Sequence, residues 1–417
     1  MLDTKGPEIR TGILRDAEPI DLKEGQELDV LTDFSLEGDA RRITISYQAL
    51  PDTVKVGDKI VIDEGQLVLE VKECLEDSVK VIVMNDHTLG EHKNVALPGC
   101  QIDLPVLTER DEIDIYDFGF KENIDIVACS FTRKESDIEK ISDFLGEKRS
   151  SIKIFAKIEC KESLDNYEAL LRAADGIIIA RGDLSREIPS EKVFLAQKWM
   201  ISEANAVGKP VIVSTEILES MVKKPRPTRA EAGDVAGIIL DGVDCLMLTH
   251  ETSIGKYPIN ATKMLVKICC EAEKTINYRR IYEDVFSKSK VPFKFSETVA
   301  SSIANTALDL KIGVLIVFTD TGRAAYILAK YRPRQTIFVC TSSSSVSRQM
   351  NVVRGVTPIL INARESVEEC ISRVIAYAKE QGMCADGSKA IVQMSSEGSG
   401  LKNDPAEECN MMKVYDI

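Results

Sequence analysis

Residues 155–183 read FAKIECKESLDNYEALLRAADGIIIARGD, and the interpretation of the whole chain starts from this stretch. Two runs of apolar and β-branched residues each end in polar side chains: Lys157 and Glu159 close the first run, and Arg181 to Asp183 close the second. The residues between the runs suffice for one amphipathic helix, so the pattern predicts a strand–helix–strand unit. Its charged groups then lie at the carboxyl ends of parallel strands, where a (β/α)₈ barrel carries its catalytic residues.

The composition is that of a soluble globular protein. The chain has 417 residues, of which 44% are hydrophobic and 29% charged, and this length is enough for about two or three domains. A formal net charge of −14 argues against nucleic-acid binding, because affinity for phosphate backbones comes from clustered Lys and Arg. No apolar run reaches the ~18 residues of a membrane span, and the N-terminus has no signal-peptide pattern. We therefore expect a cytoplasmic protein without a membrane partner.

The N-terminal quarter of the chain predicts an all-β insertion. Residues 1–10 are expected to be the end of a barrel strand, with a Gly-Pro turn that leads into a new domain. Residues 11–104 alternate between short strands and polar turns, without a long amphipathic helix. Strands are expected at 42–46, 59–62 and 79–84. We therefore expect a small β-barrel domain over residues 11–104.

Residues 105–286 predict the main part of the barrel, because a strand and an amphipathic helix alternate there. Ser190 precedes an apolar stripe that includes Met200, Ala204 and Val207, which predicts a helix packed on one face. A second helix is expected after Thr228, where Thr-Arg-Ala-Glu fits a capping box. The polar strand ends are at 128–133, 156–159, 180–183, 213–216 and 248–251.

Residues 287–417 predict a C-terminal open α/β sheet. Strands are expected at 314–318, 337–341, 358–361 and 390–394, with helices between them. The helix that begins near Ser366 places Val367, Ile371 and Val374 on one side, so we expect it to pack on that sheet. The predicted fold class is thus α/β, with a barrel, an inserted all-β domain and an open C-terminal sheet.

Three charged residues of the opening stretch predict a metal site. Glu159 and Asp183 close consecutive strands, so their carboxylates are expected to approach each other at the barrel mouth. Carboxylates without histidine suit Mg²⁺ better than zinc. Lys157 lies on the same face of its strand as Glu159 and adds a positive charge, which suits transfer of an anionic phosphoryl group. The alternative is that these residues form structural salt bridges at strand ends.

Five segments resemble pyruvate kinase, and they occur in order along nearly the whole chain. The segments are DTKGPEIR (3–10), KIE (157–159), ARGDL (180–184), TEILESMVKKPRPTRAE (215–231) and GKYP (255–258). The resemblance implies the glycolytic transfer of a phosphoryl group from phosphoenolpyruvate to ADP, giving pyruvate and ATP, with Mg²⁺ (or Mn²⁺) and K⁺ as cofactors. It also implies a mobile β lid inserted into the barrel, and assembly as a homotetramer.

The resemblance implies roles for individual residues. Lys157 would stabilise the phosphoryl group in transfer, and Glu159 and Asp183 would bind Mg²⁺. Arg10 would contact the phosphate, and the hydroxyl of Thr215 would take part in protonating the enolate.

Further positions match other ligands of the family. Asp3 and Thr4 match two ligands of K⁺, and Glu8 matches the residue type that accompanies K⁺ dependence. Backbone amides after Gly182 would receive the substrate carboxylate, as helix starts bind anions. The loop Pro225 to Arg229 would lie near a subunit interface, or would equally serve as a stiff entry to the next helix.

A second loop resembles an effector site. Residues 319–324 follow a predicted strand and open a helix, a geometry that can hold a phosphate. The resemblance is to the sugar-phosphate loop of regulated pyruvate kinases, with Thr319, Thr321, Gly322 and Arg323 as binding residues. However, Asp320 places a negative charge where fructose-bisphosphate-responsive forms favour a cation, and segment 396–400 is acidic. The alternative is an ordinary helix N-terminus.

The chain departs from the family pattern in two respects. We expect the N-terminal part of the barrel to be lacking, because the chain begins where members have already built two strand–helix units. Glu216 stands where the family has Gln, His250 where it has Gly, and Ser185 where it has Gly. An ionised Glu216 would repel anionic substrates. Two hypotheses follow: an active pyruvate kinase, or a catalytically impaired or inactive subunit that acts as an assembly or regulatory partner.

Overall fold

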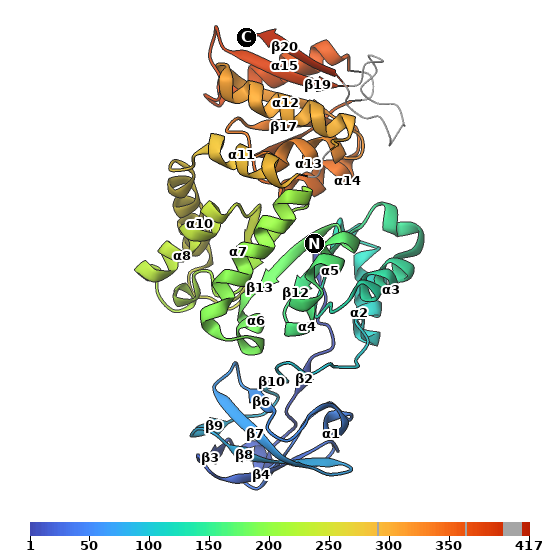
Figure 1. Cartoon of the computed structure of the whole chain (residues 1–417), viewed down its shortest axis with the longest axis vertical. Helices are drawn as coiled ribbons and strands as arrows, with labels where there is room; N and C mark the ends of the chain where they lie inside the picture. The colour runs from blue at the N-terminus through green and yellow to red at the C-terminus, as the bar shows by residue number, and fades with distance from the viewer. Residues whose placement is uncertain (290–291, 363–364, 395–410) are drawn as a thin grey trace. The chain divides into compact units, whose positions relative to one another are not determined.

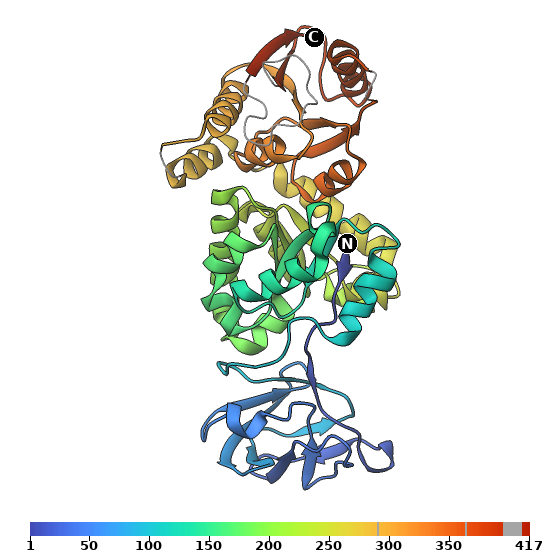
Figure 2. The same ribbon diagram turned by 90° about the vertical axis from the view of Figure 1, so that its right-hand side faces the viewer.

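The computed structural model describes residues 1–289, 292–362, 365–394 and 411–417. The chain divides into two compact units, Met1–Gln197 and Lys198–Ile417, and each is described by itself. Figures 1 and 2 trace it from the blue N-terminus to the red C-terminus in two views.

The first unit contains a parallel sheet with helices between its strands. The strands pair in the order β1 (Leu2–Asp3), β11 (Ile126–Cys129), β12 (Lys153–Ile158) and β13 (Gly176–Ala180). Every residue of β11 and β13 is buried, as expected of parallel strands covered on both faces. The helices of this region are α2 (Glu109–Ile113), α3 (Glu135–Leu145), α4 (Lys161–Asp165), α5 (Tyr167–Ala173), α6 (Arg181–Glu187) and the start of α7 (Ser190–Val207). The parallel strand pair predicted for residues 155–183 is confirmed, but two short helices, α4 and α5, lie between the strands where one helix was expected.

An all-β domain, drawn in blue in Figure 1, lies between β1 and β11 along the chain. Its larger sheet has the order β2 (Ile9–Arg10), β10 (Asn94–Ala96), β6 (Lys59–Ile62), β7 (Leu67–Cys74), β8 (Ser78–Val83), β4 (Glu27–Leu31) and β5 (Arg42–Thr44), and β3 (Ile20–Leu22) pairs with β9 (His87–Leu89). Alternate residues such as Leu67, Leu69 and Val71 are fully buried and form its core. Its one α-helix, α1 (Leu50–Thr53), is a single turn in this fully described region. The predicted domain boundaries stay predictions, and β2 places Ile9 and Arg10 in this sheet.

The second unit contains another parallel pair, β14 (Val211–Ser214) and β15 (Cys245–Met247). Along the chain, α8 (Arg229–Asp241) lies between the two strands, and α10 (Pro258–Glu273) follows β15. The capping box before α8 is confirmed, because Thr228 Oγ1 accepts the N–H of Glu231 and the Glu231 carboxylate accepts the N–H of Thr228. One expectation for α7 was wrong: Met200 and Ala204 are buried, but Val207 is 57% exposed. Val207 is the last residue of α7, and the chain turns at Gly208, which has a φ of 72°.

The C-terminal region is an open sheet with helices on both faces. The strand order is β18 (Val356–Leu360), β17 (Ile337–Thr341), β16 (Ile312–Phe318), β19 (Lys389–Met394) and β20 (Met411–Asp416). Leu315 and Val317 of β16 share a core with residues of α11 (Tyr278–Lys288), α12 (Phe295–Asp309) and α13 (Arg323–Lys330), whereas Val314 and Ile316 share the opposite core with α15 (Val367–Glu380). The predicted open sheet and the packing of α15 are confirmed. The antiparallel edge strand β20 was missed.

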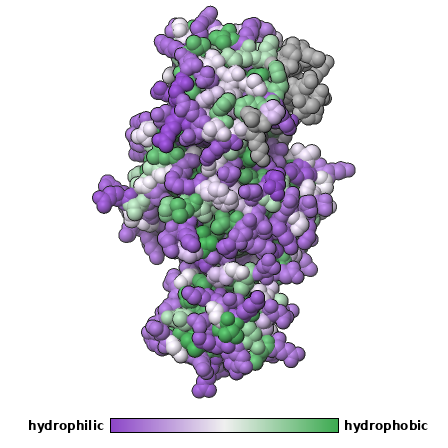
Figure 3. Space-filling view, in the orientation of Figure 1, coloured by the Kyte–Doolittle hydropathy of each residue, from purple (hydrophilic) through white to green (hydrophobic). Residues whose placement is uncertain are grey.

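The surface agrees with the composition. The face seen in Figure 3 is mainly hydrophilic, with hydrophobic residues in small groups. Across the described residues, no helix combines the length and the apolar character needed to cross a bilayer.

Candidate functional site

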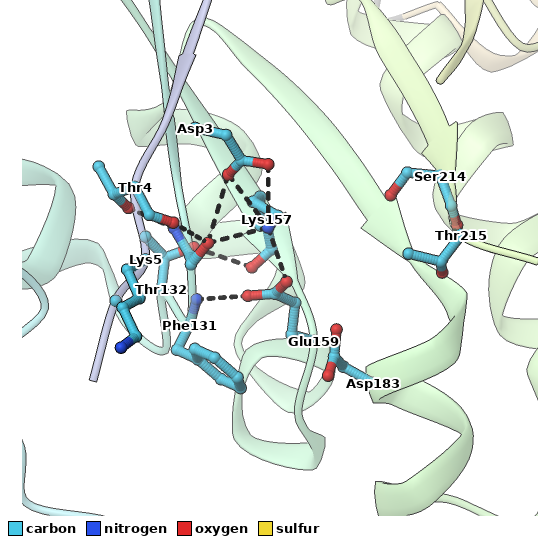
Figure 4. Close-up of polar contacts among 12 residues, drawn as sticks. Asp3, Thr4, Lys5, Phe131, Thr132, Lys157, Glu159, Asp183, Ser214 and Thr215 are labelled. Atoms are coloured by element: carbon cyan, nitrogen blue, oxygen red, sulfur yellow. Dashed lines mark hydrogen bonds and ion pairs between the residues drawn. The ribbon is translucent and has the colours of Figure 1, made fainter. Parts of the chain in front are cut away.

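The ammonium group of Lys157, near the carboxyl end of β12, is the centre of the candidate site (Figure 4). The side chain is 12% exposed, and Nζ lies 3.0 Å from Glu159 Oε1 and 3.1 Å from Asp3 Oδ1. Nζ also donates a hydrogen bond of 2.8 Å to Ser130 Oγ. Burial alone lowers the pKa of Lys157, but the two carboxylates outweigh burial and raise the pKa above its ordinary value. The ammonium group is therefore a fixed positive charge.

Glu159 directly follows β12 and is the more deeply buried carboxylate of the site, with 2% of its side chain exposed. Its Oε2 accepts a hydrogen bond of 2.6 Å from the backbone N–H of Phe131, in the loop after β11. Phe131 has a φ of 53°, a left-handed conformation that bulky residues rarely adopt. The strained turn at Phe131 therefore holds the Glu159 carboxylate in place.

Asp183, in the first turn of α6, supplies the second carboxylate, and Figure 4 shows it beside Glu159. Its Oδ1 is ion-paired with Arg186 Nη1 at 3.1 Å. Burial raises the pKa of both carboxyl groups; for Glu159, the Lys157 charge opposes this rise and repulsion from Asp183 adds to it. The structure thus brings Lys157, Glu159 and Asp183 together, and two adjacent carboxylates with raised pKa form a group that a cation would stabilise.

Asp3 and Thr4, at the end of β1, are tied to the loop after β11. Thr4 Oγ1 accepts a hydrogen bond of 3.0 Å from Ser130 N, and Ser130 Oγ donates one of 2.7 Å to the carbonyl of Thr4. The Asp3 carboxylate is ion-paired with Lys157. The two residues therefore present oxygen atoms next to the Lys157 cluster, and hard cations prefer oxygen ligands.

Arg10 and Glu8 lie on the segment that leads from β1 into the β domain. Arg10 Nη2 is 2.7 Å from Glu8 Oε2, and Nη1 donates a hydrogen bond of 2.8 Å to the carbonyl of His92. The Arg10 side chain is 37% exposed, so it can exchange these partners for an anion.

Gly182 lies between Arg181 and Asp183 in the first turn of α6. Its carbonyl accepts a hydrogen bond of 2.8 Å from the hydroxyl of Ser185. Ser185 stands where the family pattern has Gly, and this local bond satisfies its hydroxyl without involving the carboxylates.

Thr215 and Glu216 belong to the second unit and follow β14. Both have positive φ, 66° and 51°, so the strand ends in a sharp turn, and Thr215 Oγ1 donates a hydrogen bond of 2.6 Å to the carbonyl of Ser214. Glu216 is exposed. His250 is half exposed, and its Nδ1 lies 3.1 Å from Glu219 Oε1. Both substituted side chains are in contact with solvent, which weakens the repulsion expected from Glu216.

Three of the predicted effector residues, Thr319, Thr321 and Gly322, lie in the loop between β16 and α13, and the fourth, Arg323, begins α13. Thr319 Oγ1 accepts the N–H of Gly322 at 3.0 Å, and Thr321 Oγ1 accepts the N–H of Arg323 at 3.3 Å. Asp320 accepts a hydrogen bond of 3.2 Å from Ser342 Oγ, and burial raises the pKa of Asp320. Hydroxyls of the loop thus already bond two amides at the start of α13. The acidic segment 396–400 lies outside the described residues.

Sequence reasoning missed two residues that position the site. Ser130 lies in a strand end that was predicted, but its contact with Lys157 was not. Asp111 is 1% exposed and accepts the N–H groups of Lys5 and Gly6 at 2.8 and 3.2 Å, which fixes the segment after Thr4. The sequence around Asp111 shows only a capping-box pattern that runs from Thr108 to Asp111. Such a pattern predicts the start of a helix but not a contact with a distant segment.

Comparisons with known proteins agree with this site. Residues 1–262 match the family model of the pyruvate kinase barrel domain, and residues 297–415 match that of the pyruvate kinase alpha/beta domain. A pyruvate kinase of Eimeria tenella is 43% identical over 414 residues, covering 99% of this chain and 77% of the relative. A cytosolic isozyme of pyruvate kinase from Nicotiana tabacum is 42% identical over 413 residues, covering 94% of this chain and 81% of the relative.

Solved structures give the same result. A crystal structure of a pyruvate kinase from Cryptosporidium parvum has a TM-score of 0.93 and 41% identity, covering 100% of this chain and 83% of that chain. A second one, in complex with ADP, has a TM-score of 0.87 and 40% identity with the same coverage. The predicted fold class and the resemblance found in the sequence are confirmed. The chain belongs to the pyruvate kinase family of phosphotransferases.

Proposed function

We propose that this chain transfers the phosphoryl group of phosphoenolpyruvate to ADP at the cluster of Lys157, Glu159 and Asp183, giving pyruvate and ATP. The observation that carries the proposal is the buried ammonium group of Lys157, held between Glu159 and Asp3. A phosphoryl group in transfer spreads negative charge over its oxygens, so a fixed cation stabilises the transition state more than the ground state. No comparison favours the alternative of an inactive assembly or regulatory subunit.

The donor set fits Mg²⁺ or Mn²⁺. Within the described part of the chain, Glu159 accepts hydrogen bonds from Lys157 and Phe131, which leaves about half of the lone-pair sites of a carboxylate open. Asp183 offers a second carboxylate at the same place. When bound, a divalent ion would neutralise charge on the substrate oxygens. Asp3 and Thr4 lie beside Lys157 and would offer the oxygen ligands proposed for K⁺.

Three other residues complete the proposed mechanism. Arg10 would bind the phosphate after its guanidinium group leaves Glu8. Thr215 would present its hydroxyl for protonation of the enolate, and the backbone after Gly182 would hold the substrate carboxylate. The relative from Nicotiana tabacum, a cytosolic isozyme, supports a cytoplasmic location. Assembly as a homotetramer, with Pro225 to Arg229 near an interface, stays a prediction.

The effector proposal for Thr319, Thr321, Gly322 and Arg323 has weaker support. The loop's own hydroxyls bond two of the amides that a phosphate would need. Asp320 adds a carboxyl group beside them.

The proposed reaction is tested by measuring pyruvate formation from phosphoenolpyruvate, ADP, Mg²⁺ and K⁺. We expect Lys157→Met to lower kcat by about 10²-fold or more, because the lysine acts mainly in the transition state. Lys153→Met is the matched control, since Lys153 begins the same strand at the end away from the site, 3.9 Å from Asp175. The control should keep activity within about twofold.

Two results would contradict the proposal. A folded parent chain without turnover would remove the activity, and a Lys157→Met variant as active as the control would remove Lys157 from its role. Circular dichroism of each variant establishes that the fold is intact.

A further inference from the structure

Glu187 is a buried carboxylate close to the candidate site that the proposed mechanism leaves without a role. It is the last residue of α6 and lies four residues after Asp183, so both side chains lie on the same face of this short helix. Glu187, Asp183 and Glu159 line one cleft together with Arg133 and Ile102. The cleft therefore joins the candidate metal ligands to the segment that returns from the β domain.

Glu187 interacts with the backbone of two other segments. Its Oε2 accepts the N–H of Lys161 at 3.3 Å, and Lys161 begins α4 two residues after Glu159. The backbone N–H of Gly99 also faces the carboxylate and favours its ionised form. Gly99 belongs to residues 97–104, which leave the β domain after β10 and are called the hinge of the β domain below. Glu187 thus joins the helix of Asp183 to the strand end of Glu159 and to the hinge of the β domain.

The surroundings of Glu187 disfavour the ionised form of its carboxylate. Burial raises the pKa of Glu187, its two backbone donors oppose this rise, and repulsion from Asp183 adds to it. The neighbouring cation, Arg186, is ion-paired with Asp183. A side chain that only filled space would not need a charge here, since an apolar residue avoids the desolvation cost.

The hinge segment is held at a second point by a different residue. Arg133, which is 6% exposed, donates a hydrogen bond of 2.5 Å to the carbonyl of Ile102 and a further one to Leu104. Gly99 has a φ of +80°, so the chain turns between β10 and these contacts. Glu187 therefore fixes the part of the hinge nearest to the β domain, and Arg133 fixes the part nearest to the barrel.

We propose that Glu187 is a positioning residue for phosphoryl transfer, which sets Asp183 and Glu159 at the spacing that the divalent ion needs and couples this spacing to the hinge of the β domain. The proposal rests on the proposed function, because it takes Glu159 and Asp183 as the metal ligands. Glu187 touches neither substrate nor metal in this account. It acts through α6 and through the backbone of Lys161 and Gly99.

The test compares Glu187→Ala and Glu187→Gln with Glu168→Gln, an exposed glutamate of α5 that serves as the matched control. Mn²⁺ affinity is measured without substrate from the electron paramagnetic resonance signal of the free ion. Loss of an outer partner typically weakens metal binding by about 10- to 100-fold, which we expect for Glu187→Ala. Glu187→Gln keeps one carbonyl acceptor and should lose less. Hydrogen exchange should become faster at the amides of Gly99 and Lys161.

The outcomes separate the two proposals. Faster exchange at Gly99 and Lys161 with unchanged Mn²⁺ affinity would show a structural tie alone and overturn the positioning role. Unchanged exchange would overturn the two backbone interactions themselves, whether or not the parent turns over substrate. If Glu187→Ala does not fold, Glu187→Gln decides, because it is isosteric. A parent chain that binds Mn²⁺ but does not turn over substrate would contradict the proposed function. The role of Glu187 would then be supported only if both Glu187 variants bind Mn²⁺ more weakly than the parent.

Discussion

Replacing Asp244 by asparagine should destabilise the second unit by about 3–5 kcal/mol, the typical effect of breaking a buried ion pair by removing one partner. Asp244 precedes β15, and its side chain is 4% exposed. Its two oxygens accept hydrogen bonds from Arg332 at 2.6 and 2.9 Å and from the backbone N–H groups of Val211 and Arg354, both at 3.1 Å. Four donors thus converge on one carboxylate.

The magnitude follows from what the substitution leaves behind. Arg332 is 8% exposed, so its guanidinium group would stay buried without a counter-charge. Burial and repulsion from Arg332 already lower the pKa of Arg354, and Asp244 opposes that repulsion. The variant therefore leaves the buried Arg332 without a counter-charge beside Arg354, which is 13% exposed and keeps its ion pair with Glu273. It also weakens backbone hydrogen bonds worth about 1 kcal/mol each.

Urea unfolding provides the assay. Trp199 is the single tryptophan of the chain and lies in the second unit, so its fluorescence reports on the part that Asp244 stabilises. The exposed pair Arg279–Asp309 gives a matched control, since Asp309→Asn should change stability by less than about 1 kcal/mol. The double variant with Arg332→Met should recover part of the loss, because no buried cation then lacks its partner at that position. A loss below about 1 kcal/mol for Asp244→Asn, or full additivity in the double variant, would refute the reasoning.

Two further predictions concern stability. A Cβ on Gly176 would lie 2.6 Å from the ring of the buried Phe155, so Gly176→Ala should lower the stability by about 1–3 kcal/mol. Gly233 has open space around it in α8, so Gly233→Ala should raise the stability by about 0.5–1 kcal/mol. The urea midpoints of both variants check these values. Burial raises the pKa of Glu231, but hydrogen bonds led by those from Ser220 outweigh burial and lower it below the ordinary value. The stabilisation by Glu231 should therefore be complete above pH ~5 and should fade as the pH falls through the lowered pKa. Glu231→Gln should be less stable than the parent by about 1 kcal/mol at neutral pH, and this difference should shrink in acid. An equal difference at every pH would contradict the prediction.

Residue patterns with a local cause were predictable. Lys157 and Glu159 share a strand face because side chains alternate along a strand, and Asp183 follows the neighbouring parallel strand. The carboxyl ends of parallel strands meet at one edge, so these groups had to meet as well. The capping box at Thr228 was equally local, because both partners lie within one helical turn.

Contacts between distant loops were not predictable from one sequence. The bond between Ser130 and Lys157 and the bond from Lys5 to Asp111 depend on how loops of different strands turn, and no periodicity encodes such turns. The left-handed φ of Phe131 is an example, since nothing in a phenylalanine predicts it. Edge strand β20 was missed for a related reason: MMKVYD follows the undescribed segment 395–410 and carries a weak alternation.

Comparing Glu159 with Asp244 shows why one buried carboxylate suits a functional site and the other suits a structural one. Asp244 receives four donors, about as many as a carboxylate has lone-pair sites, so little capacity is left for a ligand. Glu159 is as deeply buried but receives two, from Lys157 and Phe131, and its pKa is raised by burial and by Asp183. Unused acceptor capacity in a buried, repelled carboxylate favours a cation over a proton whenever a divalent ion is available. Removing Glu159 should therefore weaken divalent-ion binding more than it destabilises the fold, whereas removing Asp244 should do the reverse.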